Sequence, residues 1–177
     1  MMTHNEYGKA LFLLAEEDGA IDTVRSDVSV AYSVLSSNPE YVKILDTPAI
    51  SKEEKLALAD EAFSTLSDNV KNLIKILCEK RSVHTFPDIY ATYNALYNER
   101  MGIVDVEAVT AIPMSASQLN LMRDKLENMT GKTIIIKNTV DPTILGGVKL
   151  RYLGIQIDGS VKTKLDSFAE SLKNIVI

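Results

Sequence analysis

The sequence predicts a mainly α fold with an α+β part, in which a six-helix N-terminal bundle precedes a small C-terminal α+β domain. Two observations lead to this prediction. Apolar residues recur at helical spacing through most of residues 1–101, and from Ile103 onward the period changes to the alternation that is typical of strands. The chain has 177 residues, enough for two small domains, which we expect to span residues 1–102 and 103–177.

The first part of the chain contains six segments with helical periodicity, joined by short connections. Gly19 ends the first segment and Gly102 ends the last, because glycine adopts the backbone conformation that closes helices. Asn38 is expected to cap the third helix, whose first position is a proline. Ser51 and Glu54 have the spacing of a capping box at the start of the fourth. The six expected helices cover residues 7–18, 21–35, 39–45, 52–63, 70–81 and 87–101.

The second part of the chain mixes strand and helix signals. Ser115 and Gln118 have the spacing of a second capping box. Asn138 and the pair Asp141-Pro142 are expected to close a β-branched strand, and Gly154 separates two further short apolar runs. The expected strands cover residues 103–108, 133–136 and two short runs between 147 and 157, and the expected helices cover residues 116–129 and 160–175.

Several glycines near the C-terminus raise the possibility of a nucleotide-binding loop. A phosphate loop of the Walker type ends in Gly-Lys-Ser/Thr and enters a helix, whereas the pair Gly146-Gly147 is followed by Val148-Lys149 and enters a strand. Asp158-Gly159-Ser160 precedes a helix, but the spacing of a dinucleotide fingerprint is missing. These glycines are therefore interpreted as turns and a helix cap that frame a small sheet, and no cofactor is predicted.

No catalytic or metal-binding constellation is predicted. Neither His4 nor His84 has the Cys, His or paired carboxylate neighbours that a metal site requires. Cys78 lies on the apolar stripe of the fifth helix, where free cysteine commonly acts as a small buried hydrophobe. The acids at 16–18 end an amphipathic helix and are interpreted as a solvated rim. The pattern favours a protein that binds partners.

Charge and hydropathy exclude two classes of partner. Residues 1–102 hold 10 Lys and Arg against 16 Asp and Glu, and residues 103–177 hold nine against eight. Neither part has the concentrated basic surface that nucleic acid binding requires, so no nucleic acid partner is predicted. No apolar run approaches the roughly 20 residues of a membrane-spanning helix, so no direct membrane span is predicted.

The C-terminal motif resembles a known family. Residues 141–149, which begin Asp141-Pro142 and contain Gly146-Gly147, together with residues 158–165, which begin Asp158-Gly159-Ser160, resemble the signature of the ATP synthase delta subunit family. That family includes the mitochondrial oligomycin-sensitivity-conferring protein. Shorter segments resemble the family in the same order, so the resemblance extends over nearly the whole chain. They cover residues 7–15, 45–55, 72–81 and 110–115.

The resemblance implies a non-catalytic subunit of F-type ATP synthase without a cofactor. Members of the family form part of the peripheral stalk, the stator that links the catalytic head to the membrane sector and resists rotor torque during proton-driven ATP synthesis. One copy per complex is expected. The expected place is the cytoplasmic face of a bacterial plasma membrane, since no transit peptide is recognised.

The resemblance also implies the partners and one binding surface. The N-terminal bundle of the family receives the N-terminal helix of an alpha subunit in a groove between the first and fifth helices, and the C-terminal domain meets the b subunits of the stalk. Carried over by position, the groove residues are Tyr7, Ala10, Leu11, Leu14, Leu73, Ile76 and Leu77.

Two other classes of protein are alternatives. One is a free-standing adaptor that binds amphipathic helices of another partner. The other is a small hydrolase or transferase, which would need a reactive residue with a positioned partner that the sequence lacks.

Overall fold

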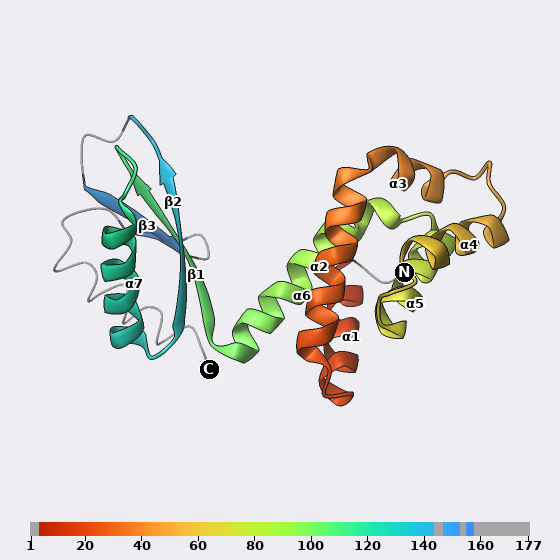
Figure 1. Ribbon diagram of the computed structural model, residues 1–177, viewed down its shortest axis with the longest axis horizontal. Helices are drawn as coiled ribbons and strands as arrows, with labels where there is room; N and C mark the ends of the chain where they lie inside the picture. Colours follow the sequence, from red (N-terminus) through yellow and green to blue (C-terminus); the bar gives the residue numbers. More distant parts are fainter. Residues whose placement is uncertain (1–3, 144–146, 153–154, 158–177) are drawn as a thin grey trace. The chain divides into compact units, whose positions relative to one another are not determined.

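The computed structural model describes residues 4–143, 147–152 and 155–157. The chain divides into two compact units, Met1–Tyr97 and Asn98–Ile177. The fold is mainly helical with an α+β part, as the sequence predicts (Figure 1). The helices that precede the first strand are α1 (His4–Glu17), α2 (Ile21–Ser37), α3 (Pro39–Asp46), α4 (Lys52–Ala62), α5 (Asp68–Lys80), the 3-10 turn η1 (Val83–Thr85) and α6 (Phe86–Met101), whose last turn belongs to the second unit.

Local capping explains where several of these helices begin and end. The capping box of α4 is present: Glu54 N donates to Ser51 Oγ at 3.2 Å, and Ser51 N donates to Glu54 Oε2 at 3.2 Å. Asn38 is the N-cap residue of α3 and Pro39 opens the helix, as predicted, but the Asn38 side chain makes no capping hydrogen bond. Asn38 Nδ2 instead donates to the carbonyl oxygen of Val34 at 2.8 Å, so this side chain bonds back to the end of α2.

Helix α6 joins the core of the first unit through two of its tyrosines, Tyr93 and Tyr97. Tyr93 has no exposed surface, and its ring meets the Phe12 ring edge-on with centroids 5.5 Å apart. Tyr93 Oη donates to the carbonyl oxygen of Ile21 at 2.9 Å, which satisfies its hydroxyl inside the core. One turn later, Tyr97 Oη donates to Asp22 Oδ1 at 2.7 Å. These contacts fix α6 against α1 and α2.

Gly8 allows α1 and α6 to approach closely. A Cβ atom at this position would lie 2.7 Å from Cβ of Thr92 and 3.0 Å from the carbonyl oxygen of Ile89. We expect Gly8→Ala to lower the free energy of unfolding by about 1–2 kcal/mol, because the overpacking cost exceeds the gain in helix propensity. Urea unfolding followed by circular dichroism measures the change. Lys9→Ala, at an exposed position of the same helix, should remain within about 0.5 kcal/mol of the parent protein. Greater stability for Gly8→Ala would contradict the close approach.

The second unit is a four-stranded sheet with one described helix. The strand order is β2-β1-β3-β4; β1 pairs with β2 in parallel and with β3 antiparallel, and β3 pairs with β4 antiparallel. The parallel pair requires a crossover, which α7 provides. Figure 1 shows α7 lying against one face of the sheet. The elements are β1 (Ile103–Thr110), α7 (Ala116–Thr130), β2 (Thr133–Val140), β3 (Val148–Tyr152) and β4 (Ile155–Ile157).

The core of this unit lies between α7 and the sheet. Leu126 of α7 has no exposed surface and belongs to a buried cluster with Val104, Val106 and Ile134, from alternate positions of β1 and β2. The alternation that predicted the first strand therefore marks its buried face.

The predicted end of β2 is correct for Asp141-Pro142, which directly follow the strand, and wrong for Asn138. Asn138 does not close β2, which continues to Val140. Its Nδ2 donates to the carbonyl oxygen of Ala108 at 2.8 Å, and its Oδ1 accepts from Met114 N at 2.8 Å, so the side chain ties β2 to β1 and to the turn before α7. Gly154 and the helix expected over residues 160–175 lie outside the described residues.

Candidate partner-binding surface

Helices α1 and α5, which are expected to form the groove, lie in contact within the first unit. Asn69 Nδ2 of α5 donates to Asp18 Oδ2, just after α1, at 2.9 Å. Ala15 has no exposed surface, so the inner face of α1 is packed against the core close to this bond. The sequence brings these two helices together because each presents an apolar stripe at helical spacing, and burying both stripes stabilises the unit.

The structure divides the seven predicted groove residues into two groups. Leu11, Leu73 and Leu77 are buried in the core. The other four remain accessible: Tyr7 is half-buried and Ala10 is exposed, while Leu14 and Ile76 keep 42% and 41% of their surface exposed. The accessible members are available to a partner, and the buried members support the two helices from within.

Leu13 is an exposed apolar residue that the sequence reasoning missed. It is 57% exposed and lies beside Leu14 on α1. Residues 11–14 form an unbroken apolar run, whereas a helix that only packs against a core needs apolar residues at every third or fourth position. This unbroken run is the sequence signal from which an exposed apolar residue on α1 could have been predicted. Leu13 and Leu14 of α1 and Ile76 of α5 are exposed large apolar residues of these two contacting helices, and we refer to the three together as the apolar face.

Two of the three lysines on α5, Lys71 and Lys75, are paired with acids of the same unit. Lys75 Nζ lies 2.6 Å from Asp60 Oδ1 of α4, and Lys71 Nζ lies 2.8 Å from Asp68 Oδ1. The hydrogen bond and charge of Lys71 hold the pKa of Asp68 below its usual range. These charges are balanced locally, so the α5 side of the surface offers a partner mainly apolar contact.

The residues that sequence reasoning weighed for chemistry do not assemble an active site among those described. Burial raises the pKa of the Cys78 thiol to about 11, which keeps it protonated at neutral pH and poorly nucleophilic. His84 Nδ1 lies 2.7 Å from Asp46 Oδ2 at an exposed position. No group of three or more His, Cys, Asp or Glu that could hold a metal ion occurs within the described part of the chain. In the same part, no helix is long and apolar enough to cross a membrane.

Two of the family-signature residues that the structure describes, Asp141 and Pro142, lie at a turn. Asp141 Oδ1 accepts from Thr143 Oγ1 at 2.6 Å and from Thr143 N at 3.0 Å directly after β2. These hydrogen bonds lower the pKa of the Asp141 carboxyl. Pro142 lies within this turn, and Gly147 has a φ of 85°, which glycine adopts without strain. The other signature residues lie outside the described ones: Gly146, Asp158, Gly159 and Ser160.

Comparison with known proteins finds one family. The family model described as the ATP synthase delta (OSCP) subunit matches residues 3–172. The ATP synthase subunit delta of Clostridioides difficile is 37% identical over 174 residues, covering 97% of this chain and 96% of the relative. That of Lactobacillus johnsonii is 32% identical over 169 residues, covering 95% and 93%.

A solved structure has the same fold. A chain of the mitochondrial ATP synthase hexamer of Toxoplasma gondii superposes with a TM-score of 0.63 at 22% identity, covering 97% of this chain and 98% of that one. At this identity the likeness supports the fold, while the family model and the bacterial relatives establish the family. The chain belongs to the ATP synthase delta (OSCP) subunit family, and it is a non-catalytic subunit.

Proposed function

We propose that the chain is a stator clamp of F-type ATP synthase: one copy in the peripheral stalk joins the catalytic head to the membrane sector and resists rotor torque during proton-driven ATP synthesis. The observation that carries this proposal is the apolar face of Leu13, Leu14 and Ile76, on two contacting helices of a chain that belongs to the delta subunit family. A clamp needs binding surfaces and no active site. We propose that the complex holds this chain at the cytoplasmic face of a bacterial plasma membrane.

The contact with the catalytic head lies on the first unit, where helices α1 to α6 act as one six-helix bundle over residues 1–102. An amphipathic helix that docks along α1 and α5 inserts apolar side chains at every third or fourth position between Leu14 and Ile76. Such docking covers apolar surface that otherwise faces water, and the gain grows with the area covered. The N-terminal helix of an alpha subunit is the proposed occupant.

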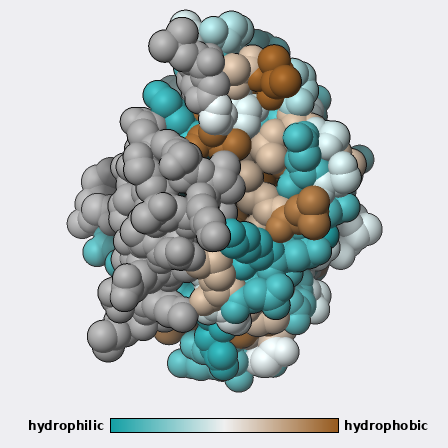
Figure 2. Space-filling view, turned by 90° about the vertical axis from the view of Figure 1, so that its left-hand side faces the viewer, coloured by the Kyte–Doolittle hydropathy of each residue, from teal (hydrophilic) through white to brown (hydrophobic). Residues whose placement is uncertain are grey.

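The contact with the rest of the peripheral stalk lies on residues 103–177, which bind the b subunits. Two large apolar side chains support a binding role for this unit: Ile112 is 74% exposed and Leu121 of α7 is 72% exposed. Figure 2 views the molecule from the side of this unit and shows brown apolar residues among teal polar ones. Near-neutral charge in this part favours binding through shape and apolar contact over long-range steering.

An affinity pull-down tests the proposal as a whole. The tagged full-length chain is used to capture proteins from detergent-solubilised membranes of its source, and each retained protein is identified by mass. We expect alpha subunits and b subunits together. Recovery of an unrelated helical partner with no synthase subunit would contradict the clamp and support a free-standing adaptor that binds amphipathic helices.

A further inference from the structure

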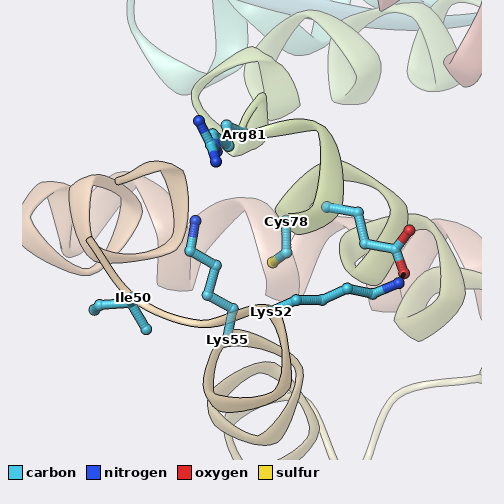
Figure 3. A pocket seen from close by; sticks show the side chains of 6 residues that line it. Ile50, Lys52, Lys55, Cys78 and Arg81 are labelled. Carbon is cyan, nitrogen blue, oxygen red and sulfur yellow. Dashed lines mark ion pairs between the residues drawn. The ribbon is translucent and has the colours of Figure 1, made fainter. Parts of the chain in front are cut away.

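A small cavity of about 80 Å³ lies where the start of α4 meets the end of α5, and cationic side chains dominate its lining (Figure 3). It is lined by Ile50, Lys52, Lys55, Cys78, Glu79 and Arg81. A water needs only about 10–15 Å³ of such space, so the cavity has room for a small polyatomic ion.

Lys55 is the unusual residue of this cavity. It is only 4% exposed, although lysine is almost never fully buried unless it is paired. Within the described residues, its ammonium has neither a hydrogen-bond acceptor nor an ion-pair partner. Lys55 also lies near the start of α4, where the positive end of the helix dipole disfavours a cation. Helix electrostatics therefore do not account for its burial.

Arg81 adds a second cation at an unfavourable backbone position. It closes α5 with a φ of 54°, a left-handed conformation that glycine usually supplies at helix ends. Its guanidinium has no acceptor among the described residues. Figure 3 shows the Lys55 ammonium and the Arg81 side chain directed toward the same space. Two cations that face one space without an anion repel each other, although the exposed position of Arg81 lets water screen part of this repulsion.

The acids and the thiol near the cavity do not balance these charges. Glu79 Oε1 is paired with Lys52 Nζ at 3.0 Å. Asp46 is not part of the lining, although its charge contributes to the raised pKa of Cys78; it accepts from Val83 N at 2.7 Å and lies 2.7 Å from His84 Nδ1. Cys78 is neutral at pH 7, since burial raises the pKa of its thiol to about 11. The cavity therefore carries two cations beyond what its own acids neutralise.

We propose that this cavity is an oxyanion site, in which one phosphate or carboxylate binds between the ammonium of Lys55 and the guanidinium of Arg81. Both ligand classes present negative oxygens that accept charge-assisted hydrogen bonds, and the planar fork of arginine matches either one. The ligand is a free anion such as phosphate or the acidic side chain of a bound partner. The site does not depend on the stator role, because it is built entirely by this chain.

Thermal unfolding of the full-length chain tests the site with two probes, inorganic phosphate and acetate, each compared with chloride at equal ionic strength. We expect at least one probe to raise the Tm of the first unit by about 4–8 °C at roughly five times its Kd. A response to phosphate alone indicates a free multivalent anion, and an equal response to acetate indicates a carboxylate. If neither probe raises the Tm above its value in chloride, the proposal is overturned.

Three variants separate the site from a general salt effect. Lys55→Met should lose the anion-specific rise in Tm and should remain folded in chloride, because methionine keeps most of the apolar stem that Lys55 buries. Arg81→Gly should also lose the rise while remaining folded, since glycine suits a positive φ. Lys80→Met removes the same charge from an exposed neighbour outside the cavity and should respond like the parent protein. An undiminished rise in both Lys55→Met and Arg81→Gly would overturn the site.

Discussion

The double variant Leu14→Asp/Ile76→Asp should bind the N-terminal helix of the alpha subunit at least about 100-fold more weakly than the parent chain. Both side chains belong to the apolar face, and each substitution places a charge where the docked helix would exclude water. A central apolar contact of a helix-in-groove interface is commonly worth about 2 kcal/mol or more, and each 1.4 kcal/mol corresponds to about tenfold in Kd. Fluorescence anisotropy with a labelled peptide of that helix measures the loss.

Exposure makes these positions suitable for the test. Leu14 and Ile76 are 42% and 41% exposed, so an aspartate at either reaches water and the variant should keep its circular dichroism spectrum. Leu11→Asp would instead bury a charge in the core, since Leu11 is only 5% exposed. Val30→Asp is the matched control: Val30 is 48% exposed on α2, outside the apolar face. Unchanged peptide affinity in the folded double variant, or an equal loss in Val30→Asp, would refute the assignment of the surface.

Leu126→Ala should lower the stability of the second unit by about 2–5 kcal/mol and leave the first unit unchanged. Leu126 is fully buried between α7 and the sheet, and its contacts lie within that unit. Truncation to alanine leaves a cavity that the neighbouring valines of β1 fill only in part. Differential scanning calorimetry should show one transition displaced to lower temperature and the other in place.

The reciprocal variant Leu77→Ala provides the control. Leu77 is fully buried in α5, and its truncation should displace only the transition of the first unit. If each variant displaces every transition by the same amount, the two units unfold as one and the proposed division at residues 102 and 103 fails.

Local signals explain why much of the fold is predictable from the sequence. Both capping boxes use a serine and a Glu or Gln three residues later, and both are present in the structure. The change from helical to strand periodicity at Ile103 coincides with the start of β1. Asn138 was predicted to end a strand because asparagine is uncommon within strands. In the structure its side chain bonds to the backbone of Ala108 and Met114, which are distant in sequence, so local signals do not reveal this role.

Features that depend on tertiary packing were not predictable. Lys55 belongs to a charged stretch that resembles an exposed helix start, yet packing between α4 and α5 leaves it 4% exposed. Within the predicted groove, spacing could not separate buried Leu73 from exposed Ile76. That separation depends on how deeply each helix packs, which hydrophobic periodicity does not encode.

Reconstitution of the connection between the catalytic head and the b subunits tests the stator role most directly. Purified catalytic head and purified b subunits from the source complex are mixed with and without the full-length chain, and the mixtures are separated by size-exclusion chromatography. We predict that head and b subunits elute together only when the chain is present, and that Leu14→Asp/Ile76→Asp releases the head while the chain stays with the b subunits. Stable elution of head with b subunits in the absence of the chain, or failure of the chain to bind either one, would contradict its role as the clamp.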